Sequence, residues 1–439
     1  MLKGRNIITR AWLLILLSFV TSLATAQGGL TDPAFAKVPF DRWLAEGERA
    51  QIRWRAQVGV IGLSNHQRLR ARIEINVDGS ELAKRGRNRP LVVLVQFDDN
   101  QGQAYQTHSL LVLQDLDERA ASKIEVSYSR DAFLLPGEYH ISMGVFDPST
   151  QEHSVTQRKL PVLPLKSDPL PDAWRDLPPV QFLPTVTPPE SWFLPSVPGR
   201  LHLPLETRHP VHIEVLVNAS PTEWVGGSRM GRVNNMNLTA LMPALKVISQ
   251  IDLRSGSLDV ALLDLTRRRV SFEQQNVREL DWTGLSDALT EANPNKIDVH
   301  SLENREQNAQ FFVAEVKRRI TAVSDPLHIL IVLSGPMAFR EGEDLHPIDV
   351  PKNPNCRVFY LRFYPPTRPP TMGDPVGAQV RGRPNVRLPA PTSGSMAQMD
   401  SLEGTLKPVE PRLFELNTPE QFRKALGTLL GEIARMGAS

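Results

Sequence analysis

The sequence of 439 residues has one cysteine, Cys356, so no disulfide can form within the chain. Its charges nearly cancel, with 50 Lys and Arg against 48 Asp and Glu, which argues against a protein that binds nucleic acid. Beyond the N-terminus, no apolar run is long enough to span a bilayer. The hydrophobic fraction of 41% is ordinary for a folded protein, and the length allows roughly two or three domains.

Sequence patterns typical of enzymes are also missing. The chain has no His-Glu-x-x-His pair for zinc, no Gly-x-Ser-x-Gly elbow, and no residues around Cys356 that indicate a thiolate nucleophile. The ten histidines are scattered and do not suggest a site. Residues 226–233 have the glycine spacing of a phosphate loop, but Arg232 and Val233 stand where a lysine and a hydroxyl residue are needed. We therefore predict a protein that is not an enzyme, with no catalytic residues.

The first 26 residues have the pattern of a secretory signal peptide. The apolar run AWLLILLSFV comes after three basic residues, Lys3, Arg5 and Arg10, and is followed by the small residues 24–26. The run is too short for a membrane anchor. We predict cleavage after Ala26, export to the periplasm or beyond the cell, and no membrane span in the mature chain.

Residues 66–165 have the short apolar periods of strands, separated by turn signals such as Asp78-Gly79. They predict an all-β sandwich of the immunoglobulin or fibronectin type over residues 27–165, with its core in 66–165. Tyr139 follows a Pro136-Gly137 turn and opens an alternating strand. This position favours a tyrosine corner, in which the ring is buried and the hydroxyl bonds to the upstream backbone.

Prolines dominate the next segment, with thirteen between residues 161 and 210. Proline removes backbone donors and holds the chain extended, so we predict a linker over residues 166–205 without a helix or a central strand. The segment also holds aromatic residues, including Trp174 and Phe182. We expect it to lie along one or both domains.

From residue 206 to 439, strongly apolar runs alternate with helical periods and predict an α/β domain with a parallel sheet. The expected strands are 211–217, 257–265, 326–333 and 356–364, and the expected helices are 238–251, 304–323 and 419–436. Pro243 should be tolerated only in the first turn of its helix. Residues 365–408 are rich in proline, and we predict a long surface insertion there.

The stretch VLVNASPTEW, residues 215–224, places Asn218, Ser220 and Thr222 at alternate positions after a strand. With the strand and helix order, it resembles the von Willebrand factor type A domain, a Rossmann-like α/β fold. In that family the first strand ends in Asp-x-Ser-x-Ser and holds magnesium in a metal-ion-dependent adhesion site. The whole arrangement resembles a group of bacterial secreted proteins described as von Willebrand factor A-related and largely without assigned activity.

The resemblance implies a magnesium site that is degenerate in this chain. Asn218 replaces the aspartate of the motif, whereas Ser220 and Thr222 keep the hydroxyls. Ser334 stands where the family places a second aspartate, and Ser301 is the counterpart of a threonine ligand. Neutral oxygens alone hold magnesium poorly, so we predict no cofactor. The alternative is a modified Mg²⁺ site at Asn218, Ser220 and Thr222.

Three hypotheses for function follow. The first is an exported interaction protein, with an adhesion- or scaffold-like role, that binds a protein partner without a complete metal site. The second is metal-dependent adhesion through Asn218, Ser220 and Thr222. The third is an extracellular enzyme with a site at the seam of the two domains. The sequence does not indicate which residues would contact the partner.

Overall fold

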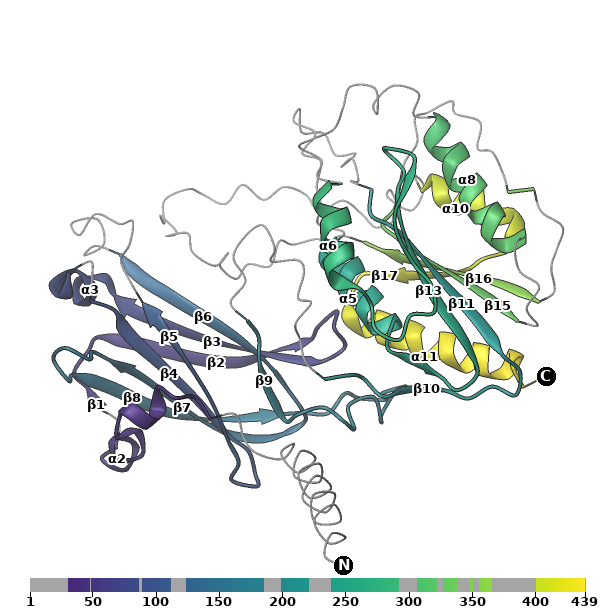
Figure 1. Ribbon diagram of the computed structural model, residues 1–439. Helices are drawn as coiled ribbons and strands as arrows, with labels where there is room; N and C mark the ends of the chain where they lie inside the picture. The colour runs from purple at the N-terminus through teal and green to yellow at the C-terminus, as the bar shows by residue number, and fades with distance from the viewer. Residues whose placement is uncertain are drawn as a thin grey trace, which may run out of the picture.

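The structure is a computed structural model. It describes residues 31–47, 49–86, 89–111, 124–184, 199–220, 238–291, 306–321, 327–337, 348–349, 355–364 and 400–438. The predicted signal peptide, Thr222, Ser301 and residues 365–399 of the predicted insertion lie outside the described residues. The described chain has an all-β N-terminal part and an α/β C-terminal part (Figure 1).

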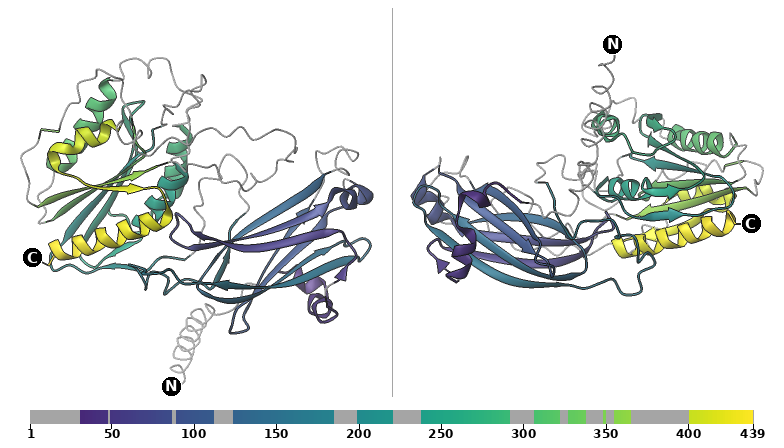
Figure 2. Two further views of the ribbon diagram at one scale, coloured as in Figure 1. Left: turned by 180° about the vertical axis from the view of Figure 1, so that it is seen from behind. Right: turned by 60° about the horizontal axis from the view of Figure 1, so that its bottom comes forward.

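Two antiparallel sheets form the N-terminal part, with strand orders β1-β8-β7-β4-β5 and β2-β3-β6-β9. In β3, alternate residues such as Ile73 and Ile75 are fully buried, as expected of strands with one face in a core. The two sheets face each other (Figures 1 and 2), and one hydrophobic core takes in residues of both. The strands are β1 (Arg49–Ala50), β2 (Trp54–Leu63), β3 (Leu69–Asp78), β4 (Leu91–Asp98), β5 (Ala104–Leu111), β6 (Glu125–Leu134), β7 (Gly137–Phe146), β8 (His153–Val162) and β9 (Val180–Phe182). The all-β character is as predicted, whereas membership of the immunoglobulin class stays a prediction.

Tyr139 has the environment that its sequence position predicts. Its side chain is 3% exposed, and its hydroxyl donates to the carbonyl oxygens of Leu135 at 2.9 Å and Pro179 at 3.1 Å. Burial raises the pKa of Tyr139, so the hydroxyl stays a donor at neutral pH. The tyrosine therefore fastens the start of β7 to the proline-rich segment.

Short helices complete the N-terminal part. The segment of η1 (Phe35–Lys37) and α2 (Phe40–Ala45) packs Phe40 and Trp43 in a small apolar cluster with Phe146 and Val155 of the five-stranded sheet. The helix α3 (Gly79–Arg85) begins at Asp78, whose carboxylate accepts from the backbone N–H of Ser80 at 2.9 Å.

The proline-rich segment contributes a strand to each part of the molecule. Its strand β9 pairs with β6, and β10 (Leu203–Leu205) pairs in parallel with β12 (Ile251–Leu253). Pro204 is exposed in β10, where its missing N–H costs no ladder bond in the sheet interior. Trp174 is buried, and Phe182 packs against the core. The segment thus lies along both domains, as expected.

The C-terminal part is built on a six-stranded sheet of order β14-β13-β11-β15-β16-β17. All neighbouring pairs are parallel except β13 and β14. The strands are β11 (Val211–Asn218), β13 (Gly256–Asp264), β14 (Arg269–Gln274), β15 (His328–Ser334), β16 (Cys356–Phe363) and β17 (Arg412–Leu416). Every residue of β15 is buried, because helices cover both faces of the sheet.

Two groups of helices cover the sheet (Figure 1). One core joins the sheet to α5 (Leu238–Ile248), α6 (Trp282–Glu291) and α11 (Pro419–Met436). A second core, which contains Leu216 and Leu330, joins the opposite face to α8 (Glu306–Thr321) and α10 (Ser401–Leu406), which η5 (Lys407–Val409) follows. The domain is therefore a three-layer α/β structure.

Two expectations need correction. Pro243 lies inside α5 rather than in its first turn. Burial of most of this helix, including Leu241 and Leu245, offsets the backbone hydrogen bond that the proline removes. Residues 400–408 of the predicted surface insertion form α10 and part of η5, and Leu402 and Leu406 are fully buried.

Candidate functional site

The strand order places the topological switch point of the sheet at the carboxyl ends of β11 and β15. When the strands of the six-stranded sheet are numbered in chain order, their order in space is 3-2-1-4-5-6. The first and fourth strands, β11 and β15, are therefore neighbours, and the later strands are added outward on both sides of this pair. Ligands of open α/β sheets bind outside the carboxyl ends of the strands at such a reversal. β11 ends at Asn218, which is 3% exposed, and β15 ends at Ser334, which is fully buried.

Hydrogen bonds hold Asn218 and Ser220 at this position. The amide Nδ2 of Asn218 donates to Ser334 Oγ at 2.9 Å, and its Oδ1 accepts from the backbone N–H of Ser220 at 3.1 Å. Ser220 Oγ accepts from the backbone N–H of Leu265 at 2.7 Å. The structure thus brings together three of the predicted positions, Asn218, Ser220 and Ser334. Their polar side-chain atoms form hydrogen bonds with one another and with the backbone at the end of the neighbouring strand β13.

Asp400, a carboxylate that was not predicted from the sequence as a site residue, lies near the same strand ends. Asp400 Oδ1 accepts from the backbone N–H groups of Met337 and Leu402, each at 3.2 Å. Its Oδ2 accepts from Tyr360 Oη at 2.8 Å and Arg362 Nη1 at 2.9 Å. Burial raises the pKa of Asp400, although these four donors favour its ionised form.

Arg362 matches this carboxylate with a buried positive charge. Its side chain is 1% exposed, and it also pairs with Glu403 at 2.6 Å and with Glu415. Burial disfavours the charged guanidinium, but its hydrogen bonds to Asp400 and Glu403 outweigh this and raise the pKa of Arg362. The carboxylate of Asp400 therefore has its countercharge within the fold.

Asn218, Ser220 and Asp400, as the structure places them, do not fit a magnesium ion. Magnesium requires oxygen ligands in octahedral geometry and carboxylates for charge. Asn218 and Ser220 offer neutral oxygens, and the four acceptor positions of Asp400 are all used by protein donors. A cation here would also lie near the guanidinium of Arg362. Thr222 and Ser301, the other predicted ligands, lie outside the described residues.

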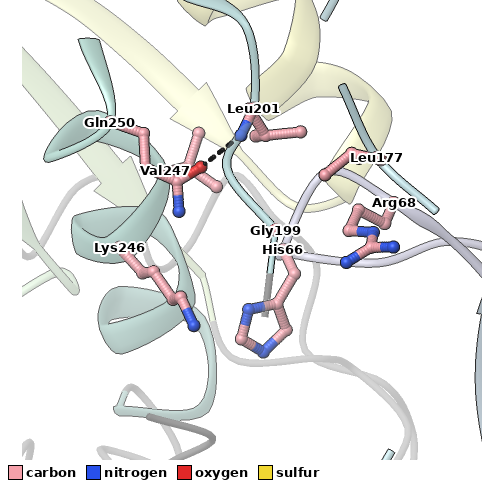
Figure 3. A pocket seen from close by; sticks show the side chains of 8 residues that line it. All are labelled: His66, Arg68, Leu177, Gly199, Leu201, Lys246, Val247 and Gln250. Carbon is pink, nitrogen blue, oxygen red and sulfur yellow. Dashed lines mark hydrogen bonds between the residues drawn. The ribbon is translucent and has the colours of Figure 1, made fainter. Parts of the chain in front are cut away.

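The seam between the two domains contains a small cavity of about 10 Å³ (Figure 3). This volume suits about one water molecule and is far below that of a substrate pocket. Burial lowers the pKa of His66 to about 3, and burial together with Arg68 lowers the pKa of Lys246 to about 8. The cavity is lined by His66, Arg68, Leu177, Gly199, Leu201, Lys246, Val247 and Gln250.

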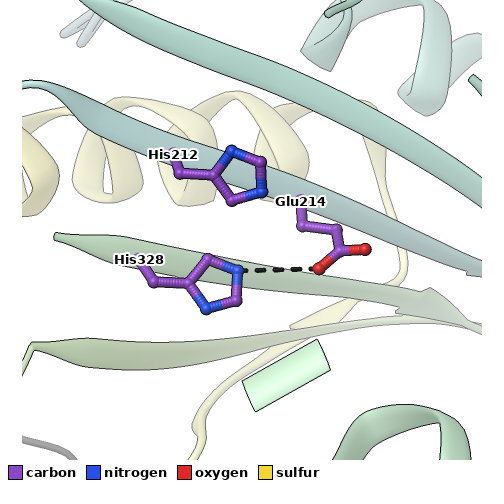
Figure 4. Close-up of side chains that lie close together, drawn as sticks. All are labelled: His212, Glu214 and His328. Atoms are coloured by element: carbon purple, nitrogen blue, oxygen red, sulfur yellow. Dashed lines mark ion pairs between the residues drawn. The ribbon is translucent and has the colours of Figure 1, made fainter. Parts of the chain in front are cut away.

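A second polar group lies at the opposite, amino-terminal edge of the same sheet. We call His212, Glu214 and His328 the basal cluster; one ligand-type atom of each lies within 4.8 Å of the others (Figure 4). His328 is fully buried, and Glu214 is 8% exposed. This cluster was not predicted from the sequence, because His212 and His328 are 116 positions apart and become neighbours only through the pairing of β11 with β15.

The fold defines a doubly wound α/β domain attached to two packed antiparallel sheets. No family model matches the chain. No curated protein matches it either. No described helix is long and apolar enough to cross a membrane.

Solved structures give only distant similarities. The chain is similar to the ArnB paralog VWA2 from Sulfolobus acidocaldarius, with 11% identity and a TM-score of 0.24 over 77% of this chain and 54% of that one. It is also similar to the Northeast Structural Genomics Consortium target SoR45, with 13% identity and a TM-score of 0.17 over 27% of this chain and 93% of that one.

Proposed function

We propose that this is an exported protein that is not an enzyme and that binds a protein partner in an adhesion- or scaffold-like role. Its α/β domain would be of the von Willebrand factor A type and would present the loops at the carboxyl edge of the sheet to that partner. The strand order supports this proposal, because it directs ligands to the reversal between β11 and β15.

One observation carries the proposal: the hydrogen bond between Asn218 and Ser334. The family that the sequence resembles has aspartates at both positions, and their charge captures a cation. Here an amide and a hydroxyl satisfy each other, and the nearby Asp400 is neutralised by Arg362. Recognition would then depend on loop shape and side chains rather than on a bridging ion.

A metal titration of wild-type and altered protein tests this proposal. Calorimetry with Mg²⁺ or Mn²⁺ should give no saturable heat with the wild-type chain. The double variant Asn218→Asp, Ser334→Asp should gain saturable binding, because it supplies two carboxylates at the ends of β11 and β15. The variant Gln157→Glu is the control, since it adds a negative charge at an exposed position on β8 of the N-terminal part. Saturable binding at millimolar concentration or tighter by the wild-type chain would refute the proposal.

Partner binding separates this function from metal-dependent adhesion. Wild-type protein should retain the same envelope proteins of its own organism with and without a chelator. The variant Ser220→Ala, Thr222→Ala should leave this retention independent of the chelator. Retention that requires divalent metal, and that this variant abolishes, would establish the metal-dependent alternative instead.

The enzymatic alternative receives less support from the structure. A site at the domain seam would need a substrate-sized cleft, typically about 300–1,000 Å³. Among the described residues, the seam holds a cavity of about 10 Å³. Hydrolysis of peptide, ester or glycoside reporter substrates by the purified chain, lost on substitution of His66, would favour the enzyme.

A further inference from the structure

Four adjacent strands of the sheet begin with side chains of polar or metal-ligand type. In the register of the sheet, His212 of β11 is paired with Ser257 of β13 on one side and with His328 of β15 on the other. His328 is in turn paired with Cys356 of β16. These four residues therefore form one row across the amino-terminal edge. Glu214 lies two residues along β11, so it projects from the same face as His212.

Side chains of neighbouring strands contact both imidazoles. His328 Nδ1 lies 3.7 Å from Cys356 Sγ, and its Nε2 lies 3.6 Å from Glu214 Oε2. His212 Nδ1 lies 2.6 Å from Ser257 Oγ. In each ring Nδ1 contacts a side chain of the neighbouring strand. Nε2 of His328 faces Glu214 (Figure 4), and Nε2 of His212 faces Asp259. A second group that fixes the far ring nitrogen is the usual support of a metal-bound histidine.

Carboxylates and one guanidinium complete the surroundings. Glu214 Oε1 accepts from Arg319 of α8, which leaves Oε2 directed at His328. Arg319 also pairs with Glu273 at 3.1 Å and Glu315 at 3.4 Å, so two further acids offset its charge. Asp259 Oδ2 lies 3.6 Å from His212 Nε2 on the other side.

We propose that His212, Glu214 and His328 bind a divalent transition-metal ion of the zinc class. Two imidazoles and a carboxylate suit zinc and differ from the all-oxygen ligand sets of magnesium and calcium. Tetrahedral zinc with bonds of about 2.0–2.1 Å places its ligand atoms roughly 3.3 Å apart. His328 Nε2 lies 3.6 Å from Glu214 Oε2, which is close to this value, and the three ligand atoms lie within 4.8 Å of one another.

The site would tie the two central strands together at the edge opposite Asn218. His212 and Glu214 come from β11, and His328 comes from β15. The side chain of His212 is 17% exposed, which gives an ion a route from solvent. Ser257 and Cys356 would be positioning residues that hold the rings. Three protein ligands leave a fourth position for water or for Asp259.

Zinc binding by the full chain is the direct test. Protein stripped with a chelator and dialysed should bind one Zn²⁺ per chain in calorimetry, and Co²⁺ should give the visible bands of a tetrahedral site. His212→Gln should weaken binding at least tenfold. The control His140→Gln changes an exposed histidine of β7 and should bind like wild type. Absence of saturable binding by wild type, or equal affinity of wild type and His212→Gln, would overturn the proposal.

Two further measurements separate loss of metal binding from loss of folding and test whether Cys356 is a ligand. Circular dichroism of each stripped variant should match wild type, and His212 is the chosen position because His328 is fully buried. The Co²⁺ spectrum should lack a thiolate charge-transfer band, and Cys356→Ser should keep tetrahedral bands with weakened affinity. A thiolate band would overturn the assigned ligand set. An ion-pair network alone would give no Co²⁺ bands in any variant.

Discussion

Arg423 donates hydrogen bonds from Nε and Nη2 to the carboxylate of Asp168, with distances of 2.6 and 2.8 Å. The same guanidinium lies 4.6 Å from the ring centre of Trp174, whose indole N–H donates to the carbonyl of Gln67 at 2.7 Å. These contacts join α11, the proline-rich segment and the hairpin between β2 and β3. The buried guanidinium of Arg423 therefore fastens the C-terminal domain to the proline-rich segment and to the N-terminal domain.

Removal of this guanidinium should destabilise the protein strongly. Arg423→Met leaves the carboxylate of Asp168 buried beside an apolar side chain, so we expect a loss of about 3–5 kcal/mol in the free energy of unfolding. Denaturant unfolding measures it. Arg435→Met changes an exposed arginine on the same helix and should have an effect within about 0.5 kcal/mol. Equal losses in the two variants would contradict the role given to Arg423.

The same ion pair predicts a dependence of stability on acid pH. Burial opposes ionisation of Asp168, but hydrogen bonds from Arg423 and the backbone of Leu170 outweigh it and lower its pKa. Because the folded-state pKa lies below the unfolded value, the stabilisation is complete above the unfolded pKa and is lost as the pH falls through the folded one. The stability gap between wild type and Asp168→Asn should therefore narrow below about pH 4. Urea unfolding at several pH values checks this; a constant gap would disagree.

Lys246 should lower the stability of the protein at neutral pH, and this effect should disappear at alkaline pH. Burial and the charge of Arg68 lower its pKa to about 8, so the charged lysine opposes folding at neutral pH. The penalty disappears as the pH rises from about 8 towards the unfolded value. Lys246→Met should stabilise the protein by on the order of 1 kcal/mol at pH 7, with a smaller gain at pH 10. The exposed Lys424→Met is the control in thermal unfolding. A gain that grows with pH would refute this.

Gly256 occupies a position that excludes any side chain. Its φ is +127°, and an added Cβ would lie 1.9 Å from the carbonyl oxygen of Val211. Gly256→Ala should therefore cost at least about 3 kcal/mol, because it combines backbone strain with a backbone clash at the start of β13. Gly59→Ala is the control, since no heavy atom lies within 4 Å of its added Cβ. Similar melting temperatures for the two variants would contradict the prediction.

The sequence predicted elements with a strong apolar period and missed weak ones. The expected helix 304–323 corresponds to α8 (Glu306–Thr321), and the expected helix 419–436 corresponds to α11 (Pro419–Met436). β14 and β17 were not predicted, because they are edge strands whose residues are mostly half-buried and give no clear alternation. Their pairing with the sheet stabilises them, and local sequence does not reveal that pairing.

The site was predictable where neighbouring strands end together. Asn218 and Ser334 follow apolar runs, so their meeting at the carboxyl edge could be anticipated. Asp400 could not, because it caps the short helix α10 inside the segment that the sequence predicts as a surface insertion. The basal cluster depends on strand register, which apolar periodicity does not determine.

The strand order of the α/β domain also determines how its sheet can form while the chain is being synthesised. β11 is the first of the six strands to be synthesised and lies in the interior of the sheet. β13 and then β14 extend one side of it, and β15, β16 and β17 then extend the other. Each newly made strand thus joins an edge that already exists, and none has to insert between two paired strands. The sheet can therefore form outward from β11 during synthesis. No later step has to open a core that has already formed.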